Sequence, residues 1–282
     1  MFTSSFKDLF KAFGPDRPKS PMLSREERLT RSMPPVVVEM LEQRRLLSYS
    51  IEVNGATMEI TGSVNGDTIS VSMSAGSIYV TDIVAGTSSG YNPNPISLIK
   101  IVAGAGADSI FINKNDAAST AIVDPCLIYG DAGNDTIDSG NYGDTVYGGD
   151  GNDSIFTWMR DDLVYAGAGF DTVSGGDDND TLRGEADSDE IDGNDGNDLI
   201  YGGDGNDDLD GWDGNDLLYG DNGDDVLADG NGADTIYGGF GSDTVNPQSD
   251  ADTDRFYGGA DSDVLNAGHS GSDWWGEFEL VN

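Results

Sequence analysis

Aspartate recurs at every ninth residue through the second half of this chain. Residues 130–246 divide into thirteen consecutive units of nine residues, and the sixth residue of every unit is aspartate. This is not explained by composition alone, since 29 of these 117 residues are aspartate. The thirteen aspartates are Asp135, Asp144, Asp153, Asp162, Asp171, Asp180, Asp189, Asp198, Asp207, Asp216, Asp225, Asp234 and Asp243. Carboxylate oxygens are hard ligands in an adaptable loop, which suits Ca²⁺ better than Mg²⁺ or Zn²⁺. We take all of them except Asp162, together with the later Asp263, as candidate ligands for several calcium ions.

A second periodicity accompanies the first and predicts the elements that position these carboxylates. The residue two places after each aspartate is aliphatic in all thirteen units, and glycine fills the first and fourth positions nine times each. A disordered acidic segment has no reason to keep such a register. We expect positions one to six to form a turn, and positions seven to nine a short strand whose middle side chain points inward.

Two such units make a coil of 18 residues, and stacked coils place equivalent turns about 4.8 Å apart. The first aspartate row then comprises Asp135, Asp153, Asp171, Asp189, Asp207, Asp225 and Asp243. The second aspartate row comprises Asp144, Asp162, Asp180, Asp198, Asp216 and Asp234. Like charges about 5 Å apart repel by roughly 3 kcal/mol at an effective dielectric of 20. Because a whole domain is stable by only about 5–15 kcal/mol, we expect folding near neutral pH to require bound cations.

These units resemble the RTX family, whose nonapeptides read Gly-Gly-x-Gly-x-Asp-x-aliphatic-x. Residues 148–156 (GGDGNDSIF), 202–210 (GGDGNDDLD) and 238–246 (GGFGSDTVN) match at every fixed position. The resemblance covers about 103–276. It implies an all-β fold, a parallel β-roll (right-handed β-solenoid), and an exported protein that folds on extracellular Ca²⁺. Within the pattern, unit 157–165 has no glycine and carries Arg160 at a glycine position, so we expect a weak or empty site at Asp162. Weaker sites are also expected at Asp144 and Asp189.

The chain before the repeats divides in two. Residues 51–102 contain β-like segments, and 62–70 (GSVNGDTIS) carries Asp67 and Ile69 in phase, which predicts a degenerate β cap. Residues 1–50 are expected to be flexible or partly helical. Their stretch 41–48 (LEQRRLLS) resembles the LEPR-XLL signature of many surface and extracellular proteins, with Gln43 where proline is commoner. That resemblance implies secretion or cell-surface sorting; residues 277–282 form a short tail.

Alternate units differ in their outward side chains. The ninth position of one set carries Tyr147, Tyr165, Arg183, Tyr201, Tyr219 and Tyr237, so one sheet should display a tyrosine ladder. Such a ladder is a normal in-sheet stack. It is also an apolar strip that could bind a protein or glycan partner, which leaves an adhesin or other binding module as an alternative function.

Composition excludes several classes of protein. The net charge of −38 opposes binding to nucleic acid or to an anionic membrane, and the longest apolar runs are too short for a membrane span. One cysteine and one histidine rule out an internal disulfide and multi-histidine zinc sites. Neither an HExxH nor a GxSxG motif is present. We therefore expect no enzyme, with an unrecognised catalytic site in 51–129 as the remaining alternative.

Overall fold

The computed structural model describes residues 50–54, 57–63, 65–74, 77–82, 87–91, 97–113, 125–249, 252–266 and 274–276. The chain divides into two compact units, Met1–Val36 and Val37–Asn282, and all described residues belong to the second. The expected N-terminal segment, apart from Ser50, and the tail 277–282 lie outside them. The described part contains no helix, and so none with the length and apolarity to cross a membrane.

Two twelve-stranded sheets make up the described part of the chain. The first sheet contains β1 (Ser50–Asn54), β2 (Thr57–Thr61), β6 (Leu98–Ala105), β8 (Cys126–Ala132), β10 (Thr145–Asp150), β12 (Leu163–Ala168), β14 (Thr181–Ala186), β16 (Leu199–Asp204), β18 (Leu217–Asn222), β20 (Thr235–Phe240), β22 (Arg255–Ala260) and β24 (Trp274–Gly276). The second contains β3 (Thr68–Ser74), β4 (Ser77–Asp82), β5 (Thr87–Tyr91), β7 (Ser109–Asn113), β9 (Thr136–Asp138), β11 (Ser154–Met159), β13 (Thr172–Asp177), β15 (Glu190–Asp195), β17 (Asp208–Asp213), β19 (Val226–Ala228), β21 (Thr244–Asn246) and β23 (Val264–Leu265).

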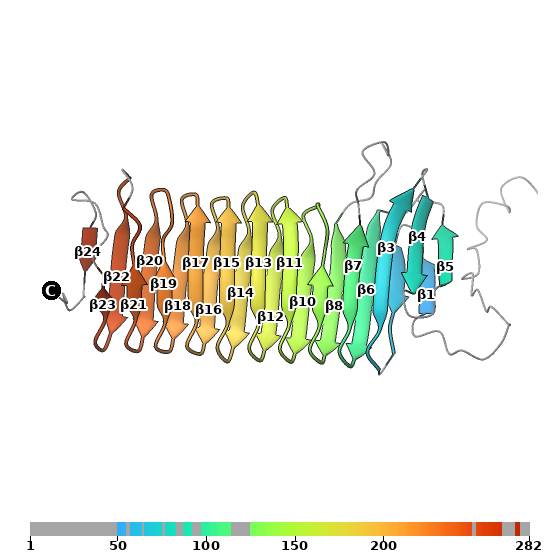
Figure 1. Ribbon diagram of the computed structural model, residues 1–282, viewed down its shortest axis with the longest axis horizontal. Coiled ribbons are helices and arrows are strands. Elements are labelled where there is room, and N and C mark those ends of the chain that lie inside the picture. Colours follow the sequence, from blue (N-terminus) through green and yellow to red (C-terminus); the bar gives the residue numbers. More distant parts are fainter. Residues whose placement is uncertain are drawn as a thin grey trace, which may run out of the picture. The chain divides into compact units, whose positions relative to one another are not determined.

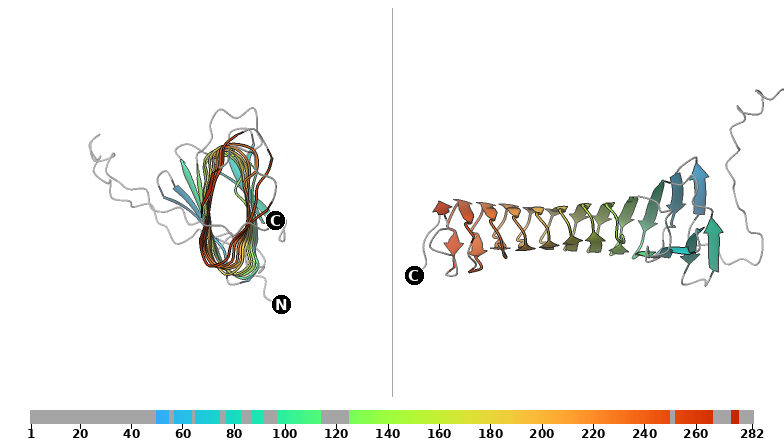
Figure 2. Two further views of the ribbon diagram at one scale, coloured as in Figure 1. Left: turned by 90° about the vertical axis from the view of Figure 1, so that its left-hand side faces the viewer. Right: turned by 90° about the horizontal axis from the view of Figure 1, so that it is seen from above.

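Successive coils pair in parallel with the predicted period. Val146 lies opposite Val164 in the first sheet, and Ile155 lies opposite Val173 in the second. Each step from β8 to β20 and from β9 to β21 is 18 residues. The strands stack side by side in Figure 1, and the coils superpose in the end-on view of Figure 2. The prediction of an all-β fold with a parallel β-solenoid is therefore confirmed.

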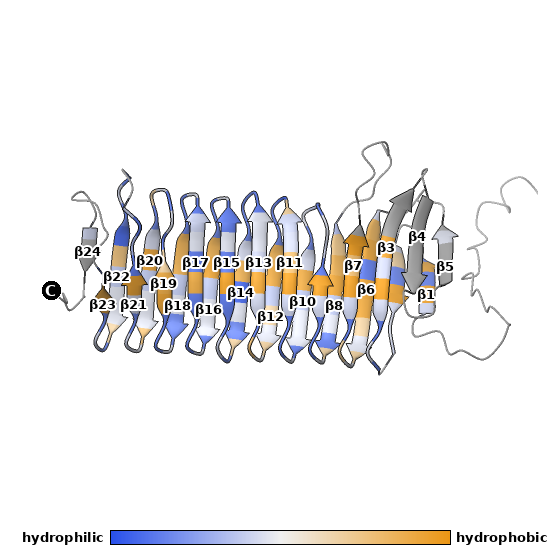
Figure 3. Ribbon diagram, viewed as in Figure 1, coloured by the Kyte–Doolittle hydropathy of each residue, from blue (hydrophilic) through white to orange (hydrophobic). Residues whose placement is uncertain are grey.

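The core is a thin double column of aliphatic side chains. The eighth residue of each unit from Ile137 to Val245 is at most 1 % exposed, because it points from its strand into the space between the sheets. Hydrophilic residues dominate the turns, and hydrophobic positions lie within the strands (Figure 3). Each full repeat thus buries one aliphatic side chain, worth about 1.5–3 kcal/mol.

Most strands are longer than the predicted three residues. β16, for example, spans six residues and includes the first three positions of the next unit. Gly203 at the second of these positions has a φ of 113°, a value that glycine reaches without strain. The strand therefore runs on where the glycines alone predicted the start of a turn.

The interval 112–129 has the length of two repeat units and carries no repeat motif. Ile101 pairs with Ile128, and Ile110 pairs with Ile137, so the coils here are offset by 27 residues rather than 18. Among its described residues, the strand that begins within the interval is β8. Residues 114–124 lie outside the described part of the chain.

Antiparallel pairs flank the parallel stack at its N-terminal end. β1 pairs with β2, and β3 pairs with β4, which pairs with β5. β2 and β3 also pair in parallel with β6 and β7, and Ile69 lies opposite Ile110. Residues 51–102 thus extend both sheets, and their assignment as a cap stays a prediction.

Two side-chain ladders follow the stack on its outside. Ring centroids in the tyrosine ladder lie 4.6–5.0 Å apart in nearly parallel pairs, and the ladder also includes Tyr129 and Tyr257. Arg183 interrupts it and lies 4.1 Å from the ring centroid of Tyr201. At the turns, the side-chain oxygen of Asn197 accepts a hydrogen bond from the N–H of Asn215, and similar bonds recur along both edges.

Candidate metal centre

The two aspartate rows lie inside the coils, at the turns that precede the strands. In each row, a carboxylate oxygen accepts a hydrogen bond from the backbone N–H of the aspartate one coil earlier. Asp198 accepts from Asp180 at 2.8 Å, and Asp216 accepts from Asp198 at 2.8 Å. Across both rows as defined from the sequence these bonds measure 2.5–3.0 Å. The predicted alignment of the thirteen aspartates is confirmed, and all of them are at most 4 % exposed.

The rows extend further than the thirteen units. Asp67 and Asp108 precede Asp135 in the first row, and Asp263 follows Asp243. In the second row the N–H of Cys126 bonds to Asp144, and Asp254 follows Asp234. Asp67, Asp108 and Asp254 were not among the candidate ligands chosen from the sequence, although Asp67 holds the sixth position of the nonapeptide-like segment 62–70.

The glycine at the first position leaves the space that the carboxylate occupies. A side chain at Gly202 would collide with Oδ2 of Asp207 in the same turn and would crowd the carbonyl oxygen of Gly220 one coil later. The same close approach occurs between Gly193 and Asp198. The repeated glycine is thus required by the neighbouring carboxylate and by the next coil, and not only by the turn.

One oxygen of most carboxylates remains without a protein partner. Within the described residues, the buried Oδ2 atoms that make no hydrogen bond belong to Asp108, Asp135, Asp153, Asp162, Asp171, Asp180, Asp189, Asp198, Asp207, Asp216, Asp225, Asp229, Asp234 and Asp243. A buried unpaired carboxylate oxygen is strongly unfavourable unless a cation or proton compensates it. Rows of such oxygens beside turn carbonyls fit a hard divalent cation such as Ca²⁺, so we retain the thirteen chosen aspartates as proposed ligands.

Burial raises the pKa values of these carboxyl groups, and neighbouring carboxylates raise several of them further. The pKa reaches about 8 for Asp180, Asp189 and Asp234, and about 9 for Asp162. In each case the hydrogen bond from the preceding coil opposes the shift by favouring the charged form. Without metal, the interior therefore holds protons near neutral pH.

The turn before Asp162 departs from the other turns. Thr157 replaces the first glycine, is buried, and donates its hydroxyl to the carbonyl oxygen of Gly175 at 2.7 Å. Arg160 takes a φ of 81°, which is unfavourable for a residue with a side chain. The Thr157 hydroxyl bonds a backbone carbonyl that a glycine at this position could not reach with a side chain, which supports the expectation of a weak or empty site at Asp162.

The raised pKa values predict that protons substitute for calcium. The metal-free folded chain binds more protons than the unfolded chain, so the stability from these protons is fully present below the ordinary aspartate pKa of 3.8 and falls as pH rises through about 6–8. In a chelator, we expect the circular dichroism signal for β-structure to increase as pH falls from 8 to 5. An unchanged or decreasing signal would contradict the assignment of raised pKa values.

Restoring glycine to the irregular turn should create a working site. We expect the double variant Thr157→Gly, Arg160→Gly to bind about one more calcium ion per chain than the parent in calorimetric titration, because the carbonyl is freed and the backbone strain removed. Met159→Gly, at an exposed position in the same turn, is the matched control and should leave the stoichiometry unchanged. Equal stoichiometry in all three chains would show that the parent turn already binds calcium.

A family model for the RTX calcium-binding nonapeptide repeat (four copies) matches residues 128–158, 160–191, 183–218, 219–254 and 249–269. These matches together span half of the chain. No curated protein was found to match it. The model indicates no catalytic family. With its period of nine, its parallel coils and its rows of buried aspartates, the chain belongs to the RTX family of calcium-binding nonapeptide repeats.

Proposed function

We propose that this protein is exported, folds when it binds extracellular calcium, and then serves a structural or cell-surface role. The observation that carries the proposal is the pair of aspartate rows, in which most of the buried carboxylates keep one oxygen without a protein partner within the described residues. When bound, calcium supplies the positive charge that the interior lacks. The chain supplies the carboxylates and turn carbonyls and holds them one above another.

Coupling between binding and folding follows from the position of the sites. Each carboxylate is bonded to the backbone of the neighbouring coil, so a complete site requires two coils to be stacked. An unfolded chain therefore offers no preformed site, and binding free energy becomes folding free energy. Because neighbouring sites share a coil, we expect cooperative binding.

Export agrees with this coupling. Calcium is scarce in the cytosol, so the acidic repeats would stay unfolded inside the cell and fold outside it. The LEPR-XLL-like stretch 41–48 supports sorting to the surface, although it lies outside the described residues. Fractionation of the producing cells, with the chain recovered from the surface or the medium, tests this part of the proposal.

The folding proposal is tested by calcium titration of the metal-free chain at neutral pH. We expect β-structure to appear cooperatively in circular dichroism as calcium is added. Asp198→Asn keeps the shape of a buried ligand but removes its charge, and should weaken the apparent affinity about tenfold, or about 1.4 kcal/mol. Asp195→Asn, an exposed aspartate in the same turn, is the charge-matched control and should titrate like the parent. Full β-structure in the chelator, or equal titrations for both variants, would contradict the proposal.

A binding module for a protein or glycan is the second candidate. The exposed edges of the tyrosine ladder support it, as do Phe170 and Phe240, which are 60 % and 67 % exposed. Phe240 lies beside a groove that also contains Glu185, Asp204 and Asp221. The stacked tyrosines cover one another's ring faces, so a ligand would meet ring edges and the isolated phenylalanines. Specific signals on a glycan array in calcium would favour this function, whereas a blank array would remove its glycan form.

A further inference from the structure

Asp229 breaks the repeat at a position where a side chain meets the metal row. It occupies the first position of its unit, where most repeats have the glycine that makes room for the sixth-position carboxylate. Among the described units from 130 to 246, the other exceptions at this position are Ser139, Thr157 and Ala166, so Asp229 alone is charged. Its side chain is 1 % exposed and therefore lies inside the coil.

A local departure from the 18-residue spacing holds this carboxylate in place. Pro247 and Gln248 are two extra residues, and they lengthen the step from Asp234 to Asp254 to 20 residues. Oδ1 of Asp229 accepts hydrogen bonds from the N–H of Gln248 at 2.6 Å and of Gly230 at 2.8 Å. The Gln248 side chain anchors the insertion by donating to Asn231 at 3.0 Å. The insertion and the aspartate thus form one built feature.

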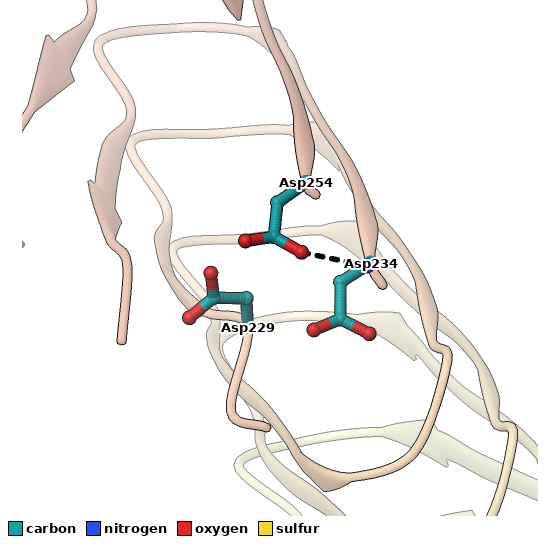
Figure 4. A group of neighbouring side chains, drawn as sticks. All are labelled: Asp229, Asp234 and Asp254. Atoms are coloured by element: carbon teal, nitrogen blue, oxygen red, sulfur yellow. Dashed lines mark hydrogen bonds between the residues drawn. The ribbon is translucent and has the colours of Figure 1, made fainter. Parts of the chain in front are cut away.

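The carboxylate of Asp229 lies close to two carboxylates of the second aspartate row. Ligand oxygens of Asp229, Asp234 and Asp254 all lie within 4.8 Å of one another, and all three residues are at most 1 % exposed. Figure 4 shows the three side chains as neighbours, with the hydrogen bond between Asp254 and Asp234 drawn as a dashed line. A carboxylate oxygen of Asp254 accepts a hydrogen bond from the backbone N–H of Asp234 at 3.0 Å, as in the rest of the row. Oδ2 of Asp229 and Oδ2 of Asp234 are buried and make no hydrogen bond within the described residues.

We propose that Asp229, Asp234 and Asp254 form a three-carboxylate calcium site that binds more tightly than the repeat sites and fills before them. Elsewhere in a row, each gap between coils brings together the sixth-position carboxylates of two coils. Here a third carboxylate adds negative charge at the same point, and the affinity of a calcium site rises with the number of charged ligands. The proposal rests on calcium binding by the rows, and it assigns Asp229 a ligand role that no repeat position has.

The test is a calcium titration of the full chain against a competing chromophoric chelator, with three variants. Asp229→Asn keeps the side-chain shape and removes the charge, and Asp229→Gly restores the residue typical of the repeat. Asp208→Asn removes the same charge from an exposed strand position and is the control. We expect the parent and Asp208→Asn to show one tight step, and both Asp229 variants to lose at least about tenfold in the affinity of that step.

The outcomes separate this inference from the proposed function. A parent that binds several calcium ions, with the same isotherm in both Asp229 variants, would overturn the three-carboxylate site and leave calcium-dependent folding intact. A parent that binds no calcium would overturn both. Circular dichroism in saturating calcium distinguishes a lost ligand from a misfolded chain, because Asp229→Gly should retain the β-structure of the parent. If it does, and the tight step is still lost, the assignment of Asp229 stands.

Discussion

Repulsion between stacked carboxylates is the constraint on which the rest of this structure depends. A coil buries one aspartate at each of its two turns, and the next coil places another aspartate directly over each of them. The aliphatic column contributes only one side chain per unit, so it cannot offset both this repulsion and the entropy of ordering nine residues. Something positive has to enter the rows. We propose that calcium supplies this charge, and that protons supply it when the pH falls.

Interactions that need no metal fix how the coils stack once they form. The inner carboxylate accepts a hydrogen bond from the coil before it, and the outer asparagine accepts one from the coil after it. These opposite directions leave only one register for adjacent turns. Stacked tyrosines and the Arg183–Tyr201 contact reinforce that register on the first sheet. Each such contact is worth about a kilocalorie per mole or less, so together they specify the arrangement more than they supply its stability.

The period of nine made most of the fold predictable, because a single register fixes the inward residue, the turn and the row to which each aspartate belongs. The 27-residue offset around 112–129 could not be predicted, because the interval carries no motif and its length of two units does not fix how many of its residues join the sheets. The strands were predicted to be too short because glycine was taken to mark the start of a turn. In β16, however, Gly203 lies within the strand and adopts a positive φ. Asp229 was missed because it is one of 29 aspartates between 130 and 246. Its place against Asp254 depends on the insertion at Gln248.

Hydrogen exchange of the aspartate backbone amides tests the central claim most directly, because these N–H groups donate to the carboxylates of the next coil. Mass spectrometry of peptides from 130–246 would follow exchange at neutral pH with calcium and with a chelator. The account predicts strong protection of these amides in calcium and exchange close to that of an unfolded chain after chelation. Equal protection in both conditions would show that the coils stand without cations, and would contradict the account.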